Sequence, residues 1–63
     1  MRELDRTDRR ILALLQQDGR MALSELAERV GLSATPTAER VRRLEKDDVI
    51  LGYHARINPR AVA

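Results

Sequence analysis

The stretch that decides the fold is LSELAERVGLSATPTAERVR, residues 23–42. Its first half carries apolar residues at i, i+3, i+4 and i+7, the one-sided spacing of an amphipathic helix. These residues are Leu23, Leu26, Ala27 and Val30. Gly31 then ends the helix, because glycine adopts the left-handed conformation beyond a helix end without a steric cost. The stretch therefore predicts a short helix over about 23–30, followed by a tight turn.

A second helix is expected directly after this turn, over about 34–46. Ser33 is a suitable N-cap residue, since a serine oxygen can accept a hydrogen bond from the first turn. The alternative places Thr35 at the N-cap and Pro36 at the first helical position. A three-residue turn favours Ser33. One core-facing stripe is expected on this helix, formed by Thr37, Val41 and Leu44. Two helices joined by a glycine-containing turn form a helix-turn-helix, here residues 23–42.

The residues before the motif predict a supporting helix over about 6–17. Asp5 is a good N-cap, and Asp8 can return a hydrogen bond in a weak form of the capping box. Gly19 is expected to end this helix in the left-handed conformation. The core stripe of the helix consists of Ile11, Leu12, Leu14 and Leu15. Ala22 then stands where the helix over 23–30 needs a cap, and alanine offers no side-chain acceptor.

The residues after the motif predict a turn and one β-strand. Asp47 and Asp48 form the turn, because aspartate tolerates the left-handed conformation better than most residues. Residues 49–51 are expected to be buried, and residues 53–57 alternate apolar and polar, which is typical of a strand with one apolar face. Pro59 ends that strand. The expected fold is mainly α: a three-helix winged helix-turn-helix over residues 1–59, with a short C-terminal β-strand.

Composition restricts the class of protein. The chain has 63 residues and no cysteine, so we expect one small domain without disulfides or thiolate metal sites. No apolar run approaches the roughly 18 residues of a membrane span, and no signal-peptide pattern precedes the domain, so a cytoplasmic location is expected. His54 is the single histidine and has no second metal ligand at a suitable spacing. No catalytic arrangement of residues is recognisable, so an enzyme is not expected.

The net charge of +2 is unevenly distributed. Residues 33–46 carry four cations against Glu39 and Glu45, whereas residues 22–32 are acidic. A basic second helix is what a phosphate-facing surface requires. The alternative is an ordinary solvated helix face.

Four blocks of the sequence together resemble one family of proteins. They are LDRTDRRILALLQQDGR (4–20), ELAERVGLS (25–33), TPTAERVRRLE (35–45) and GYHARINP (52–59). In this order and spacing they are similar to the N-terminal DNA-binding domain of the Lrp/AsnC family, the leucine-responsive, feast/famine transcription regulators. The sequence departs from the family at Asp48, where glycine is usual, and at Thr37, where a bulkier apolar residue is common.

The resemblance implies partners and a domain order. Residues 60–63 would begin a linker to a ligand-binding α/β domain that senses an amino acid and builds dimers. The amino-acid effector is then expected in that domain, and no cofactor or metal in this chain. Double-stranded DNA is the expected partner, in the cytoplasm and associated with the nucleoid. A homodimer is expected, with contacts between two copies through residues 52–58, from Gly52 to Asn58.

The second helix of such a motif lies in the DNA major groove, with its N-terminal residues nearest the base edges. Thr35 can contact a thymine methyl group, and Glu39 can accept a hydrogen bond from cytosine N4. Arg42 or Arg43 can reach guanine or a phosphate, and the first turn with Ser33 suits a phosphate. The candidate DNA-binding residues are Ser33, Thr35, Pro36, Thr37, Glu39, Arg40, Arg42, Arg43 and Lys46.

Several of these candidates have purely structural alternatives. Glu39 can pair with a neighbouring arginine on the helix surface. Arg40 lies beside the core stripe, where it can pack its stem and pair with Glu25 or Glu28. For the domain as a whole, the alternative function is a winged helix used as a protein-interaction or RNA-binding module.

Overall fold

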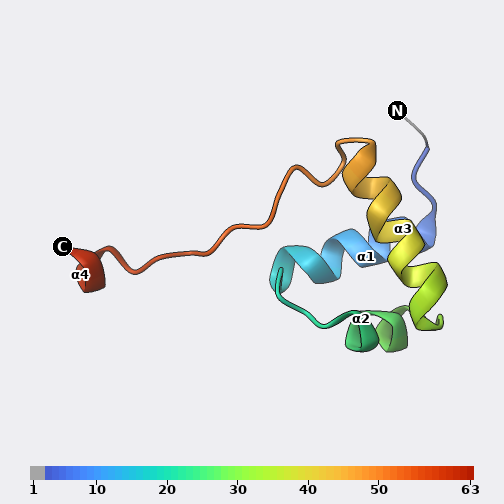
Figure 1. The fold of residues 1–63 in the computed structure, drawn as a ribbon, viewed down its shortest axis with the longest axis horizontal. Helices are drawn as coiled ribbons and strands as arrows, with labels where there is room; N and C mark the ends of the chain where they lie inside the picture. Colours follow the sequence, from blue (N-terminus) through green and yellow to red (C-terminus); the bar gives the residue numbers. More distant parts are fainter. Residues whose placement is uncertain (1–2) are drawn as a thin grey trace.

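The computed structural model describes residues 3–63 as three packed helices, an extended segment and one short helical turn (Figure 1). Helix α1 spans Arg6–Gln17, α2 spans Leu23–Val30, α3 spans Ala34–Lys46 and α4 spans Pro59–Val62. The three predicted helices are confirmed. The fold is mainly helical, with α2 and α3 forming the helix-turn-helix and α1 packed against both.

Helix α1 begins with the capping box that the sequence predicts. The Asp5 carboxylate accepts the backbone N–H of Asp8 at 2.8 Å, and the Asp8 carboxylate accepts the backbone N–H of Asp5 at 3.3 Å. The end of α1 differs from the prediction, because Gly19 does not have a positive φ. Asp18 closes the helix instead: its carboxylate accepts the N–H of Arg20 at 3.0 Å, as aspartate does in many turns.

The turn between α2 and α3 follows the predicted chemistry. Gly31 has φ 76°, the left-handed conformation, and Leu32 donates its N–H to the carbonyl of Ala27 at 3.0 Å. Ser33 occupies the N-cap position of α3, which decides against Thr35. One detail was wrong: the Ser33 side chain accepts no capping hydrogen bond.

The core lies where the three helices meet. Ile11 of α1 and Leu44 of α3 are completely buried, and Leu14, Leu26 and Ala27 are nearly so. Partly buried residues surround them, among which are Leu12, Leu15, Met21, Val30 and Val41. The apolar stripes read from the sequence therefore face one another, although Leu23 lies at the edge and is 40% exposed.

Residues 51–58 form an extended segment that leaves the helices, and we call it the arm (Figure 1). No strand is found within residues 3–63, so the strand predicted over 53–57 stays unconfirmed. Val49 and Ile50 pack against the core as expected, but Leu51 is 87% exposed, so its predicted burial was wrong. The turn before the arm contains Asp48 at φ 57°, the left-handed conformation anticipated there.

Beyond the arm, residues 60–62 belong to α4, a helical turn that the sequence analysis did not predict. The Asn58 side chain caps this turn by accepting the N–H of Arg60 at 3.0 Å, and Pro59 is at its start. The missing N–H of proline costs nothing there, because the first N–H groups of a helix have no partner within it.

The N-terminus of α2 is a weak point that can be repaired. Ala22 has the extended backbone of an N-cap residue but no side-chain hydrogen bond. We expect Ala22→Ser to raise the free energy of unfolding by about 0.5–2 kcal/mol, because the serine oxygen would accept an N–H of the first turn. Chemical denaturation measures the change. Ala13→Ser, at an exposed position inside α1, is the control and should give no gain. An unchanged or lowered midpoint for Ala22→Ser would contradict the assignment of the cap.

Candidate nucleic-acid interface

Helix α3 presents most of the predicted DNA-binding residues to solvent. Seven of the nine candidates are exposed: Ser33, Thr35, Pro36, Glu39, Arg42, Arg43 and Lys46. They extend from the residue before α3 to its last residue, so one element positions all of them. The tight turn at Gly31 holds the start of this helix at the surface of the domain.

Thr37 is the first candidate that the structure removes from this surface. Its side chain is 0% exposed, and its hydroxyl donates to the carbonyl of Ser33 at 2.9 Å. The prediction of Thr37 as a DNA contact was therefore wrong, whereas its place in the core stripe is confirmed. The buried hydroxyl is satisfied within the first turn of α3, which is why a polar residue is tolerated at this core position.

Arg40 is the second candidate with a different environment. Its guanidinium contacts Asp5 at 2.8 Å and Asp8 at 3.2 Å, and its side chain is only 30% exposed. The hydrogen bond to Asp5 raises the pKa of Arg40 further above its usual value. The suggested pairing with Glu25 or Glu28 was wrong, because the observed partners come from the N-terminus of α1. The Asp5 and Asp8 pairing was missed, since 35 and 32 residues separate these partners from Arg40.

Glu39 and Arg42 form an ion pair on the surface of α3, which is the structural alternative predicted for Glu39. The distance between their charged groups is 3.0 Å, and the two side chains are 50% and 68% exposed. An exposed pair at this spacing stabilises a helix by only about 0.2–0.5 kcal/mol. A phosphate or a base edge can therefore displace it at little cost.

Arg43 and Lys46 supply positive charge at the C-terminal end of α3. Within residues 3–63, neither side chain forms an ion pair with a carboxylate. Both lie in the last turn, where they also complement the helix dipole. Arg43 lines a shallow hollow of about 390 Å³ with Asp5, Pro36, Glu39 and Arg40.

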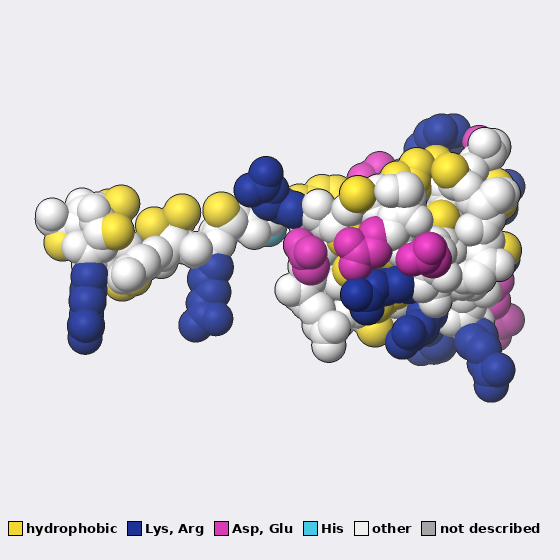
Figure 2. Space-filling model, turned by 90° about the horizontal axis from the view of Figure 1, so that it is seen from below, with side chains coloured by type: hydrophobic (Ala, Val, Ile, Leu, Met, Phe, Trp, Pro, Cys, Tyr) yellow, Lys and Arg dark blue, Asp and Glu magenta, His cyan; other side chains and the backbone are white. Residues whose placement is uncertain are grey.

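The excess positive charge of the chain lies in its C-terminal part. All ten acidic residues lie in residues 1–48, and the ten cations of that part balance them. The net charge of +2 thus comes from Arg56 and Arg60, beyond α3. Figure 2 shows acidic and basic side chains together on the compact body, and basic side chains projecting from the C-terminal extension. On α2, Glu25 pairs with Arg29 at 2.9 Å.

The start of the arm is attached to the helices by Tyr53. Its hydroxyl donates to the carboxylate of Glu45 at 2.8 Å, and desolvation together with this bond raises the pKa of Tyr53 to about 12. A side-chain carbon at Gly19 would lie 3.7 Å from the Tyr53 ring, so the ring covers that glycine. Sequence periodicity placed Tyr53 on a strand face and did not anticipate this contact with α3.

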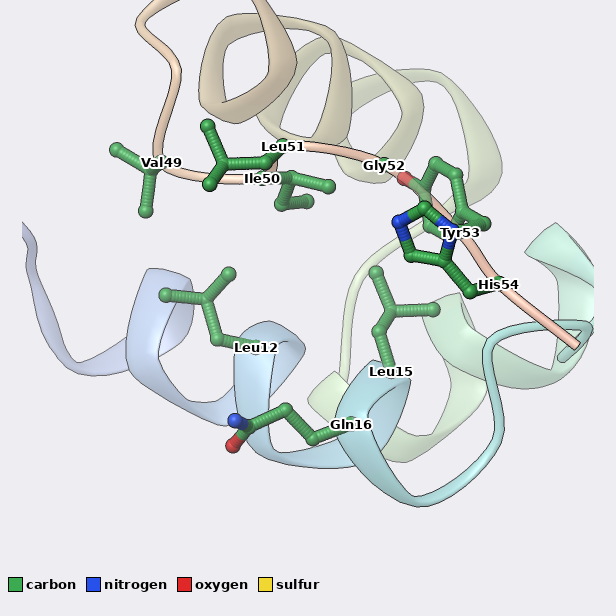
Figure 3. Close-up of a pocket in the computed structure, with 9 residues that line it drawn as sticks. All are labelled: Leu12, Leu15, Gln16, Val49, Ile50, Leu51, Gly52, Tyr53 and His54. Carbon is green, nitrogen blue, oxygen red and sulfur yellow. The ribbon is translucent and has the colours of Figure 1, made fainter. Parts of the chain in front are cut away.

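An open apolar hollow of about 510 Å³ lies beside this attachment. In Figure 3, Leu12 and Leu15 project from α1 towards Val49 and Ile50 of the chain that follows α3. His54 lines the same hollow and is exposed, as expected for a surface histidine. In the part of the chain that the structure describes, no three histidine, cysteine or acidic residues are grouped to hold a metal ion, and no helix has the length and apolarity to cross a membrane.

Comparison with known proteins gives one family match. A family model described as "Winged helix-turn-helix DNA-binding" matches residues 4–50, which include all three main helices. The leucine-responsive regulatory protein of Escherichia coli (strain K12) is 59% identical over 58 residues. That alignment covers 92% of this chain and 35% of the relative, so the chain spans about a third of the relative's length.

Solved structures agree with this match. The Mycobacterium tuberculosis leucine response regulatory protein LrpA is 56% identical with a TM-score of 0.85, over 94% of this chain and 40% of that protein. An AsnC family transcriptional regulator from Agrobacterium tumefaciens is 44% identical with a TM-score of 0.87, over 94% and 39%. A transcriptional regulator from Neisseria meningitidis, solved in complex with L-Met, is 42% identical with a TM-score of 0.91, over 95% and 39%.

Proposed function

Since the chain belongs to the winged helix-turn-helix DNA-binding family, in the form shared by Lrp/AsnC transcription regulators, we propose that α3 reads duplex DNA sequence-specifically. The chain is a DNA-binding domain and not an enzyme. The observation that carries the proposal is the exposed row of polar and basic side chains on α3, presented by the turn at Gly31. The second helix of this motif is the one that enters the major groove.

The roles of the α3 residues follow from their positions. Thr35 and Glu39 lie in the N-terminal half, which is nearest the base edges in this docking geometry. Ser33 and the first N–H groups of α3 suit a phosphate, because the N-terminus of a helix attracts anions. Arg42, Arg43 and Lys46 extend the positive charge along the helix and can reach phosphates or guanine.

In the whole regulator, this domain would be the reader and a further domain the sensor. A relative solved in complex with L-Met supports an amino-acid effector, and we propose that it binds outside residues 1–63. We place no cofactor or metal in residues 1–63. The proposed location is the cytoplasm, in association with the nucleoid, because duplex DNA is the partner.

Two substitutions in α3 test the proposed reading. We expect Arg43→Ala to weaken binding to all duplexes about equally and to flatten the salt dependence by about one unit of slope, because one phosphate contact is lost. If Arg43 reads guanine instead, the loss falls on one base position and reaches about 1–3 kcal/mol. Thr35→Ala should leave the slope unchanged and alter the preference at one position.

Binding is measured by fluorescence anisotropy at several salt concentrations, with duplexes enriched from a random pool. Ala13→Ser on the outer side of α1 serves as the control and should change neither the salt slope nor the base preference. If Arg43→Ala, Arg42→Ala and Thr35→Ala all leave affinity and base preference unchanged, α3 is not the reading helix.

We also propose a homodimer through residues 52–58, in which the predicted strand forms by pairing with a second copy. The arm exposes a run of backbone groups and large apolar side chains, and such an edge favours pairing with another chain. Leu51, Tyr53 and Ile57 are 87%, 46% and 61% exposed. The hollow between α1 and residues 49–54 gives a second copy an apolar surface to cover.

Sedimentation at high protein concentration tests this association. We expect a concentration-dependent dimer, and we expect Ile57→Asp to abolish it because the charge falls on the apolar face. Arg56→Asp introduces the same residue on the opposite face, where a strand points its polar side chains, and should be tolerated better. A parent chain that stays monomeric at high concentration would exclude this dimer.

A further inference from the structure

An ionic cluster joins the start of α1 to the middle of α3. One guanidinium nitrogen of Arg40 contacts both carboxylate oxygens of Asp5, at 2.9 and 2.8 Å, and one oxygen of Asp8, at 3.2 Å. Asp8 is completely buried, whereas the Asp5 side chain is 53% exposed. A buried carboxylate is costly unless it is paired and hydrogen-bonded, and Arg40 is one of the groups that stabilise the Asp8 carboxylate.

The two carboxylates are themselves fixed by the capping box of α1, in which each accepts the backbone N–H of the other residue. The position of Arg40 is thereby set by α1. One guanidinium nitrogen makes all three contacts, so they fix the end of the Arg40 side chain between the two carboxylates. The cluster therefore constrains how α3 lies across α1.

The residues that would meet DNA lie next to this constraint. Arg40 lines one hollow with Pro36, Glu39 and Arg43. A change in the angle of α3 at Arg40 would move Glu39 and Arg43 directly. Base recognition depends on such placement, because a displacement of about 1 Å breaks the hydrogen-bond geometry that distinguishes one base from another.

We propose that Arg40 is a positioning residue and not a DNA contact: held by Asp5 and Asp8, it fixes the angle of α3 and so determines which base edges α3 meets. This inference rests on the proposed function of α3 as the reading helix. It assigns a role in specificity to Asp8, a residue that cannot touch DNA because it is fully buried.

Asp8→Asn gives the sharpest test, because a charge effect and a positioning effect change different quantities. Removing a negative charge should by itself strengthen the attraction of the domain for DNA. The positioning role instead predicts that the ratio of specific to non-specific affinity falls by about tenfold, as for one mismatched base pair. The probes are the most enriched duplex from a random pool and a shuffled duplex of the same composition. Glu25→Gln is the matched control: it removes one charge from a surface pair on α2 and should leave the ratio unchanged.

Substitutions at Arg40 and Asp5 separate the cluster from the other roles of these residues. Arg40→Gln should lower the specificity ratio without changing the salt slope. Arg40→Lys should restore part of the ratio, since the lysine ammonium keeps the positive charge but not the shape of the guanidinium. Asp5→Asn should also lower the ratio, although asparagine caps a helix about as well as aspartate does. Circular dichroism checks that each variant is folded. If Asp8→Asn does not fold, Asp8→Asn/Arg40→Gln replaces the ion pair by two neutral amides and should lower the ratio as Arg40→Gln does.

Two outcomes would overturn the inference. A salt slope that flattens by about one in Arg40→Gln, with an unchanged specificity ratio, would make Arg40 a phosphate contact. If Asp8→Asn or the double variant binds both duplexes more tightly by the same factor, the cluster acts through charge alone. The proposed function fails separately, when Thr35→Ala, Arg42→Ala and Arg43→Ala all change neither affinity nor base preference.

Discussion

Leu44→Ala is expected to leave the chain largely unfolded at room temperature. Leu44 is 0% exposed and belongs to the core cluster in which all three main helices meet. Replacing a buried leucine by alanine costs about 2–5 kcal/mol, because burial is lost and a cavity remains. A single core in a domain of this size supplies at most about 3–5 kcal/mol of net stability. The loss is therefore comparable with the entire free energy of unfolding.

Circular dichroism and chemical denaturation measure this loss. Leu51→Ala removes the same atoms from a side chain that is 87% exposed, and it should change the free energy of unfolding by less than about 0.5 kcal/mol. The comparison separates burial from residue type. A Leu44→Ala variant within about 1 kcal/mol of the parent chain would contradict the packing of α3 described above.

The helices could be predicted because their determinants are local. The capping box at Asp5, the left-handed glycine at Gly31 and the apolar stripes act over three to eight residues, and the structure confirms each of them. The left-handed conformation of Asp48 also follows from the turn alone. Where a local pattern had two solutions, as at Ser33 and Thr35, the length of the turn selected the correct one.

Contacts between distant residues could not be predicted in this way. No periodicity pairs Arg40 with Asp5 and Asp8, which come from another helix. Likewise, Tyr53 was placed on a strand, whereas its hydroxyl bonds to Glu45 of α3. The exposure of Leu51 could not be predicted for the same reason. An apolar run indicates that burial would be favourable, but it does not say which other residues lie against each side chain.

For the candidate site, the structure shows which of the predicted residues are exposed. Seven of the nine residues lie on the exposed surface of α3 and its N-cap. Thr37 was placed both in the core and at the interface, and only the core role fits its burial. Which exposed residues touch bases and which touch phosphates stays a prediction, because that distinction depends on the duplex.

DNA affinity is expected to fall by about two to three orders of magnitude when salt rises from about 50 to 200 mM. One copy can neutralise roughly three to five phosphates, through cations of α3 together with a helix N-terminus or Arg56. At about 0.9 per phosphate, the slope of log affinity against log salt is about −3 to −5. At physiological salt we expect weak binding, in the range of ~10⁻⁴–10⁻⁶ M, unless a second copy or domain adds contacts.

The slope itself tests whether α3 is the element that meets DNA. It should be compared for the parent chain and for two triple variants with the same change in net charge. One replaces Arg42, Arg43 and Lys46 of α3 by alanine, and the other replaces the exposed Arg6, Arg9 and Arg10 of α1. We predict that the α3 variant loses most of the slope and that the α1 variant stays near −3 to −5. Equal flattening in both variants, or an unchanged slope in the α3 variant, would contradict the assignment of α3 as the DNA-reading helix.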